Sequence, residues 1–296
     1  MSYRFLSFKT GEEHDIEQWE NRSLEGELRS FEGRTLVRIF NRFLQDRKAR
    51  ILEGGCGFGA WCEWFQQQGH DIVGIEYDPR IVDRARKFKP DVAVELGDIT
   101  DLKYPDNSFD AYVSLGVIEH FEHGPQKALA EAYRILKPGG LAFVTTPYLT
   151  LLRRLVSHPV RSLYFFWRKV KGKPNYFWEY RFTKKELRRF LEEAGFEIIH
   201  EDVDDYEPWV RNRHIGLWAD WFFLRQPNGE IWELNKLGRA ILRVLRLFPA
   251  SWYCSGLHLV ARAQKEPATQ TEQKQDEPVK QTTSNPQPKK EGLVWT

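Results

Sequence analysis

The stretch ILEGGCGFGAWCEWF, residues 51–65, decides the fold of this chain. An apolar run ends in Glu53, glycines stand at positions 54, 55, 57 and 59, and an amphipathic segment follows. Glycine suits such a loop because a Cβ would block a ligand or force a strained φ. The order of strand, glycine loop and helix therefore predicts a site at which a cofactor lies close to the backbone.

Two different cofactors fit this loop. Gly55, Gly57 and Ala60 satisfy the dinucleotide pattern G-x-G-x-x-G/A, whereas Glu53 and the glycines satisfy acid-x-G-x-G-x-G. A dinucleotide site directs the helix N-terminus at a pyrophosphate, which Glu53 would repel. S-adenosylmethionine (SAM) has no phosphate and carries a sulfonium and an ammonium, which an acid at the strand end attracts. The charge of Glu53 favours SAM, and a dehydrogenase-like fold remains the alternative.

The composition is that of a globular protein with no general affinity for polyanions. The 296 residues are 41% hydrophobic and 29% charged, with a net charge of only +2. Cys56, Cys62 and Cys254 form no C-x-x-C pair, which argues against a disulfide framework and a zinc site and favours a reducing cytosol. The N-terminal residues lack the pattern of a signal peptide, and no window approaches about 18 uninterrupted apolar residues. We therefore expect a cytoplasmic protein without a membrane span.

Strand and helix patterns alternate from residue 49 onward, and this predicts an α/β fold with a parallel sheet covered on both faces. FTKKELRRFLEEAGFEII restores the alternation after an interruption, with a capping box formed by Thr183 and Glu186. The strands are expected at 49–54, 71–76, 92–97, 109–115, 140–146, 196–201 and 257–263, and the first three helices near 59–68, 79–88 and 124–136.

Other parts of the chain do not follow this alternation. Residues 1–48 are predicted to form a polar to amphipathic helical cap, and excursions at about 148–182 and 203–256 interrupt the main pattern. Residues 264–296 are rich in Gln, Thr, Pro, Lys and Glu, so we expect a disordered tail. The final GLVWT is either a frayed end or a short docking peptide.

Further motifs follow the glycine loop in a fixed order. Glu76 ends the second strand, 23 residues after Glu53, where a carboxylate can accept hydrogen bonds from two ribose hydroxyls. Both cofactors contain that ribose. Asp98 follows the third strand, where it can accept from an adenine amino group, and Ile99 can pack on the ring. FDAYVSLGVIEHF then forms the fourth strand, and ILKPGGLAFVT leads into the fifth.

Taken together, these motifs resemble the class I SAM-dependent methyltransferases, and more narrowly the broad group that includes ubiquinone- and menaquinone-biosynthesis methyltransferases. The resemblance is strong over residues 49–147, extends to about 200, and includes LHLVARA, which resembles the last, antiparallel strand of that fold. It implies a Rossmann-like doubly wound seven-stranded sheet over 49–263, with helical lid insertions, and SAM as the cofactor.

The resemblance also implies a role for each matching residue. Glu53, Gly55 and Gly57 would lie along the methionine part of SAM, Glu76 would hold the ribose, Tyr77 would flank the adenine, Asp98 and Ile99 would bind it, and Leu115 would offer backbone near the cofactor amine.

His120 is the first candidate for a catalytic base, because it follows the fourth strand at the carboxyl edge of the sheet. The alternative is that Glu119 and His120 only orient the loop and touch SAM or backbone. Some quinone-type relatives bind a metal here through acids and a histidine. Glu119, His120, Glu122 and His123 are too loosely spaced for that, so we predict no metal.

The two excursions are where substrate specificity is expected, because the sheet does not need them. The first is dense in Arg, Lys and aromatic residues, and in the second Arg239, Arg243 and Arg246 share one predicted helix face. Such features fit a membrane interface or a lipid-linked or anionic substrate. A plain helical lid with its arginines in water is the simpler alternative, and single-stranded nucleic acid is a weaker one.

The prediction is a SAM-dependent methyltransferase that acts on a small or lipid-linked metabolite, at oxygen. Peripheral contact with the inner face of the membrane is expected through 148–182 and 237–248, and nucleic acid is not expected as a partner, since Ser114, Leu115 and Gly116 stand where base-methylating enzymes carry Asn/Asp-Pro-Pro-Tyr. A SAM-binding scaffold without activity and an RNA methyltransferase are the alternatives.

Overall fold

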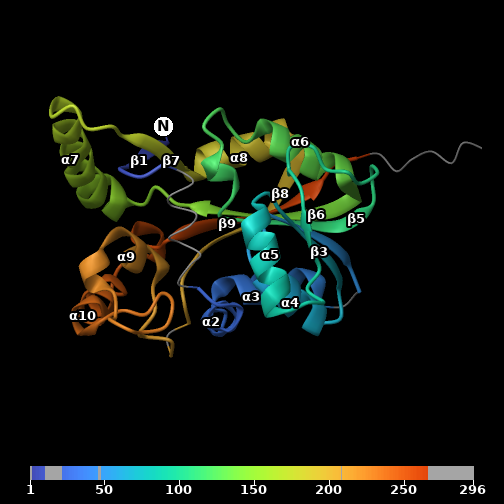
Figure 1. Cartoon of the computed structure of the whole chain (residues 1–296), viewed down its shortest axis with the longest axis horizontal. Coiled ribbons are helices and arrows are strands. Elements are labelled where there is room, and N and C mark those ends of the chain that lie inside the picture. Colours follow the sequence, from blue (N-terminus) through green and yellow to red (C-terminus); the bar gives the residue numbers. More distant parts are fainter. Residues whose placement is uncertain (1, 11–21, 46–47, 208, 266–296) are drawn as a thin grey trace, which may run out of the picture. The chain divides into compact units, whose positions relative to one another are not determined.

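The computed structural model describes residues 2–10, 22–45, 48–207 and 209–265. Within them a seven-stranded sheet has the order β4-β3-β2-β5-β6-β9-β8 (Figure 1). Its strands are β2 (Arg50–Gly54), β3 (Asp71–Glu76), β4 (Val94–Leu96), β5 (Phe109–Leu115), β6 (Leu136–Pro147), β8 (Phe196–Val203) and β9 (Gly256–Ala263). The ladders from β4 to β6 are parallel, and β9 is antiparallel to both β6 and β8. The predicted Rossmann-like sheet with an antiparallel last strand is confirmed.

Alternating side chains of the strands build one hydrophobic cluster on each face of the sheet. Ile51, Val113 and Phe143 belong to the first cluster, and the ring of Phe143 lies 5.1 Å from that of Phe40. The neighbouring residue Leu52 belongs to the second cluster. The first face is covered by α2 (Leu24–Ser30), α3 (Thr35–Leu44), α4 (Ala60–Gln67) and α5 (Pro79–Phe88), and the second by α6 (Gln126–Ile135) and α8 (Lys184–Glu193).

The N-terminal segment differs from the helix that its sequence predicted. Residues Tyr3–Ser7 form β1, which pairs antiparallel with β7 (Tyr176–Arg181) in a separate two-stranded sheet. The helical prediction was wrong here because the partner strand lies more than 160 residues further along the chain, where a local pattern cannot reveal it. The helices α2 and α3 lie in the cap as predicted, while residues 11–21 and 46–47 lie outside the described part.

The two excursions contain helices as expected, together with β7. The first holds a π-helical turn η2 (Arg153–Ser157) and α7 (His158–Val170). The second holds α9 (Ile215–Asp220), η3 (Phe222–Leu224), α10 (Lys236–Leu245) and η4 (Ala250–Trp252), which share a small core. The proposed limits of the methyltransferase domain at 49 and 263 stay predictions, and the predicted disordered tail from 266 onward lies outside the described residues.

Buried ion pairs join the two excursions. Asp220 at the end of α9 accepts hydrogen bonds from the Nε of Arg153 at 2.8 Å and from Nη1 of Arg181 at 2.7 Å. All three side chains are almost fully buried. Burial alone would raise the pKa of Asp220, but the two guanidinium groups outweigh it and hold the pKa well below its usual value. This ionised carboxylate therefore stabilises the packing of η2, β7 and α9.

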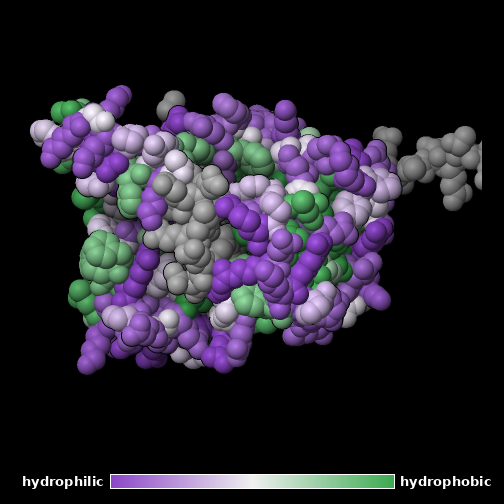
Figure 2. Space-filling view, in the orientation of Figure 1, coloured by the Kyte–Doolittle hydropathy of each residue, from purple (hydrophilic) through white to green (hydrophobic). Residues whose placement is uncertain are grey.

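At the surface, charged and polar side chains cover much of the face shown in Figure 2, and apolar groups appear between them, both at the end that carries α7, α9 and α10 and in the opposite half. Among the described helices, none is both long enough and apolar enough to cross a bilayer.

We expect Asp220→Asn to lower the free energy of unfolding by about 3–5 kcal/mol, because it leaves the buried guanidinium of Arg153 without a counter-charge and that of Arg181 with Glu179 alone. Asp101→Asn is the matched control, since the ion pair between Asp101 and Lys103 is exposed and such pairs contribute about 0–1 kcal/mol. Urea unfolding followed by tryptophan fluorescence measures both. Equal losses in the two variants would contradict the role given to Asp220.

Candidate cofactor site

The glycine loop after β2 adopts a backbone that other residues disfavour. Gly55, Gly57 and Gly59 have φ values of +71°, +56° and +76°, all in the left-handed region. A Cβ on Gly55 would lie 2.5 Å from Cγ2 of Val117, so space as well as conformation requires glycine there. The N–H groups of Gly55 and Cys56 donate to the carbonyl oxygen of Ile75 at 2.8 and 3.1 Å. The loop is thereby held against the carboxyl end of β3.

Glu76 fixes the same loop through its side chain. Its Oε2 accepts the N–H of Gly57 at 3.0 Å, and its Oε1 accepts those of Tyr77 at 2.9 Å and Asp78 at 3.1 Å. Burial raises the pKa of Glu76, and these three hydrogen bonds oppose that rise by stabilising the carboxylate. Two carboxylate oxygens offer about four acceptor sites, so capacity remains for a ribose hydroxyl.

Glu53 lies at the end of β2, almost fully buried beside the loop. The Sγ of Cys62 donates to its Oε2 at 3.2 Å. Burial raises the pKa of Glu53 well above its usual value, and the charge of Glu76 adds to this in the same direction. A carboxylate in such a place is ionised at low cost only beside a cation. The cationic amino-acid part of SAM meets this requirement, so the donor set fits the predicted cofactor.

The residues assigned to adenine lie at the ends of the neighbouring strands. Tyr77 follows β3 and is 65% exposed, while Asp98 follows β4 and is exposed as well. The Oδ1 of Asp98 accepts the N–H of Thr100 at 2.8 Å, which shapes the turn. Ile99 is buried, and its Cγ2 lies 3.0 Å from where a Cβ on Gly54 would be. Ile99 therefore packs against the end of β2 at the same edge of the sheet.

Leu115 and His120 belong to the next strand and the turn after it. Leu115 ends β5 and is half-buried, and His120 ends the short 3-10 helix η1 (Ile118–His120). The Nδ1 of His120 lies 2.8 Å from the carbonyl oxygen of Trp178 on β7. Since a carbonyl only accepts, Nδ1 carries the hydrogen, and Nε2 is the basic nitrogen of the neutral ring. This is the tautomer that a general base needs.

The structure brings Glu119, His120 and Glu179 together, with one ligand atom of each within 4.8 Å of the others. Glu122 forms an ion pair with Arg4 instead. Glu179 accepts from the Nε of Arg181 at 3.0 Å, and burial, aided by the charge of Glu179, raises the pKa of Glu119 well above its usual value. Glu179 is engaged by Arg181, and the absence of a metal at this cluster stays a prediction.

A second chain of polar side chains lies beside Leu115, and no sequence motif points to it. Thr145 on β6 pairs with Leu115 on one side and with His258 on the other. Its Oγ1 lies 2.7 Å from Nδ1 of His258, whose Nε2 lies 3.4 Å from Oδ1 of Asp204. Arg34 donates to Oδ2 of Asp204 at 3.0 Å.

The charge of Asp204 sets the direction of this chain. Burial alone would raise its pKa, but Arg34 and His258 together lower the pKa well below its usual value. An ionised Asp204 orients the hydrogen of His258 onto Nε2, so that Nδ1 accepts the hydroxyl hydrogen of Thr145. The Oγ1 of Thr145 then has lone pairs to accept a further proton. Only the folded sheet register brings these side chains together, because they come from distant segments of the chain.

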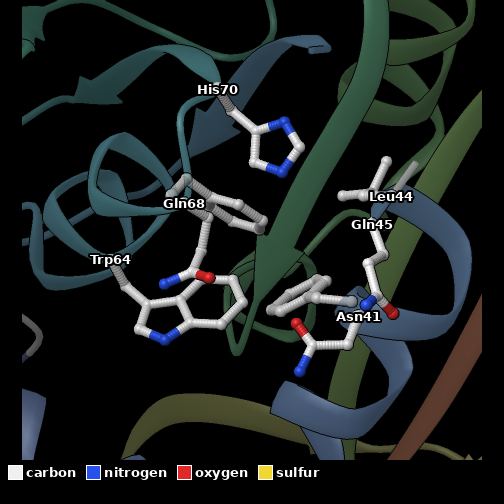
Figure 3. Close-up of a pocket in the computed structure, with 8 residues that line it drawn as sticks. Asn41, Leu44, Gln45, Trp64, Gln68 and His70 are labelled. Atoms are coloured by element: carbon white, nitrogen blue, oxygen red, sulfur yellow. The ribbon is translucent and has the colours of Figure 1, made fainter. Parts of the chain in front are cut away.

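A small cavity among the described residues lies elsewhere. It has a volume of about 60 Å³ and is lined by Phe40, Asn41, Leu44, Gln45, Trp64, Phe65, Gln68 and His70. Figure 3 shows α3 and α4 facing each other across it. His70 directly precedes β3, so the cavity lies at the amino edge of the sheet. Cofactor sites span roughly 300–1,000 Å³, and in open α/β sheets they lie at the carboxyl edge, so this cavity is not the cofactor site.

Comparisons with known proteins agree with this geometry. Residues 52–144 match a family model described as a methyltransferase domain. A probable SAM-dependent methyltransferase of Mycolicibacterium smegmatis is 32% identical over 148 residues, which is 50% of this chain and 52% of the relative. A demethylmenaquinone methyltransferase of Renibacterium salmoninarum is 37% identical over 92 residues, which is 31% of this chain and 38% of the relative.

A solved structure shows the same fold over a longer range. The crystal structure of a SAM-dependent methyltransferase from Mesorhizobium loti has a TM-score of 0.52 and 18% identity, covering 81% of this chain and all of that one. By contrast, the chain spans only about half or less of the length of the two sequence relatives. The comparisons therefore support the fold and a methyltransferase domain over residues 52–144. The individual roles of the site residues stay predictions.

We expect SAM to bind more tightly as the pH rises above about 4.5, because binding favours the ionised form of Glu53, whose pKa is raised in the free protein. The slope is up to about tenfold per pH unit for each proton released, and it ends once the pH exceeds that raised pKa. Calorimetry across this range measures it, and Glu53→Gln should reduce the slope. Part of the pH dependence should remain in Glu53→Gln, because the pKa of Glu76 is also raised in the free protein.

Glu63→Gln is the control, because Glu63 is a buried acid of the same region that is already paired with Lys89. It should keep the wild-type slope. An unchanged slope in Glu53→Gln would show that Glu53 does not face the cationic part of SAM.

Proposed function

We propose that this chain, which carries a class I SAM-dependent methyltransferase domain, transfers the methyl group of SAM to a small or lipid-linked metabolite, at oxygen. The family and the cofactor are as the sequence predicted, whereas the acceptor and the accepting atom are our proposal. The observation that supports it best is the basic nitrogen of His120, which the carbonyl of Trp178 orients at the carboxyl edge of the sheet.

Methyl transfer places few demands on the protein beyond positioning and proton removal. Bound SAM supplies a methyl group on a sulfonium, whose departure leaves a neutral thioether. The buried carboxylates Glu53 and Glu76 would hold the amine of its methionine part and its ribose, respectively. Holding the acceptor in line with the sulfonium accounts for much of the rate enhancement. An acceptor hydroxyl must also lose its proton, which requires a base.

Two groups qualify as that base. In the first arrangement, Nε2 of His120 takes the proton of the acceptor hydroxyl directly. In the second, the proton passes to Oγ1 of Thr145 while the hydroxyl hydrogen of Thr145 moves to Nδ1 of His258, and Asp204 balances the resulting charge. We favour His120, because it is exposed, whereas Thr145 and His258 are buried.

We further propose that the protein acts in the cytoplasm and contacts the inner face of the membrane peripherally, through 148–182 and 237–248. A lipid-linked acceptor would then be met at the membrane surface. The name of one relative specifies demethylmenaquinone, and this supports an acceptor of lipid character for the present chain. The alternatives of a SAM-binding scaffold and of an RNA methyltransferase are distinguished by the experiment that follows.

We expect labelled product when the protein is incubated with methyl-labelled SAM and a lipid and metabolite extract, with the label on oxygen by mass spectrometry. His120→Ala should lower kcat by about 100-fold or more while SAM affinity stays unchanged, because only proton removal is lost. Thr145→Val is the comparison and should change kcat far less. A larger loss of kcat in Thr145→Val than in His120→Ala would instead assign the role of base to Thr145 and His258.

Two outcomes would reject the proposal as a whole. Tight SAM binding without product in any extract would favour a scaffold, and label found in total RNA alone would favour an RNA methyltransferase. Binding of NAD in place of SAM would reject the cofactor itself.

A further inference from the structure

The helix α7 has its polar and apolar sides reversed relative to an ordinary surface helix. Its inner side meets β1, where the guanidinium of Arg161 lies 3.7 Å from the centre of the Phe5 ring and donates to the carbonyl oxygen of Leu6. The ring of His158 stacks on that of Tyr3 at 3.7 Å. Arginine and histidine thus occupy the side that faces the protein, where a surface helix normally places its apolar stripe.

The opposite side of α7 is apolar and exposed. Its central stripe is spaced i, i+4, i+7, i+11, i+14, which places the side chains on one side of the helix. These residues, which we call the outer face of α7, are Val156 in the preceding turn η2 and Val160, Leu163, Trp167 and Val170 in α7 itself, and each is between 44% and 60% exposed. Leu155, Tyr164 and Phe166 flank the stripe and are exposed too. Contiguous apolar surface of this kind marks a docking site.

The charges around the outer face have one sign. The sequence holds no Asp or Glu from Tyr148 to Trp178. Arg154 is exposed before the helix, and Lys169, Lys171 and Lys173 are exposed around its end. An apolar face with large aromatic side chains, bordered by lysines, complements the boundary between acyl chains and anionic headgroups.

The second excursion adds apolar groups at the same end of the molecule but few free charges. Phe222, Phe223, Val244, Leu247 and Phe248 are exposed, and α9 and α10 lie at the same end of the view as α7 in Figure 1. Hydrogen bonding of Arg153 to Asp220 holds the two excursions together.

The arginines in and directly after α10 contribute less exposed positive charge than their spacing in the sequence suggested. Arg246 donates to the carbonyl oxygen of Tyr206 and lies 3.7 Å from Asp205, and Arg239 donates to the carbonyl oxygen of Leu234. Of the three arginines that share a predicted face, only Arg243 is fully exposed. The basic charge at this end therefore comes chiefly from α7.

We propose that the outer face of α7 docks on a bilayer surface that contains anionic lipids. The helix is about 20 Å long, shorter than the roughly 30 Å hydrocarbon core, so it lies in the plane of the interface. The face is a single convex helix with mixed aliphatic and aromatic groups, which suits a fluid surface better than the shaped partner of a protein interface.

Docking also brings the candidate base near the bilayer. Only five residues separate the end of α7 from β7, and Trp178 on β7 contacts His120 through its carbonyl oxygen and its ring. The inference rests on the proposed function only in the reason given for docking, which is access to a lipid-linked acceptor. The binding itself requires neither SAM nor an acceptor.

Co-sedimentation of the full chain with vesicles tests the proposal. We expect binding to vesicles of phosphatidylcholine with phosphatidylglycerol, and weak binding to phosphatidylcholine alone. Leu163→Ser/Trp167→Ser removes apolar contact, and Lys169→Gln/Lys171→Gln/Lys173→Gln removes charge. Each should weaken binding to the anionic vesicles by at least about tenfold. Added salt should weaken the wild type more than the lysine variant.

Leu96→Ser is the control, because Leu96 is equally exposed but lies on β4, at the opposite edge of the sheet. It should bind vesicles as the wild type does. All variants change exposed side chains, and circular dichroism together with SAM binding verifies that they are folded.

The proposal would be overturned if the wild type did not bind anionic vesicles. It would also be overturned if both the Leu163→Ser/Trp167→Ser variant and the triple lysine variant bound them as tightly as the wild type does. The proposal would also be overturned if the protein did not bind vesicles but formed a dimer in sedimentation equilibrium, and if Leu163→Ser/Trp167→Ser dissociated that dimer. The outer face of α7 would then bind a second copy of the chain. Loss of methyl transfer with vesicle binding intact would instead reject the proposed function alone.

Discussion

The cofactor site depends on one buried carboxylate. Glu76 at the end of β3 accepts hydrogen bonds from the backbone of Gly57, Tyr77 and Asp78, so a single side chain fixes both the glycine loop after β2 and the turn that starts α5. The left-handed glycines give the loop its shape, but without this acceptor the N–H of Gly57 would lose its partner in a buried place, which is costly. The position of Glu53 beside the loop follows from the same arrangement.

Much of the fold was predictable because local signals agree with the tertiary structure. The strands at 71–76 and 109–115 have the bounds that their apolar patterns predicted, and β9 is antiparallel as the resemblance implied. The failures have a common cause. The strand β1 exists through pairing with β7, and Arg246 faces Asp205 instead of water. Both depend on partners far along the chain, which no local pattern encodes.

The residues of the candidate site also fall into two groups, those that a local sequence motif reveals and those that only the folded structure brings together. Glu53, Gly55, Gly57 and Glu76 form a sequence pattern because their geometry is local to two strand ends. Thr145, His258 and Asp204 form none, since only the sheet register between β6 and β9 and the path of the chain after β8 bring them together. The same holds for Glu119 and Glu179, whose proximity couples the candidate base to the buried ion pairs of Arg181 and Asp220. These ion pairs in turn connect the two excursions, and with them α7, to the edge of the sheet at which the candidate cofactor site lies.

The central claim is that the two buried carboxylates bind different parts of the cofactor, Glu53 the amine of its methionine part and Glu76 its ribose. A crystal structure with S-adenosylhomocysteine tests it most directly. The account predicts a ribose hydroxyl on Glu76, the amine close to Glu53 and the backbone of Leu115, and the thioether sulfur directed toward the side of His120. S-adenosylhomocysteine bound away from the carboxyl ends of β2 and β3, or with its ribose on neither carboxylate, would contradict it.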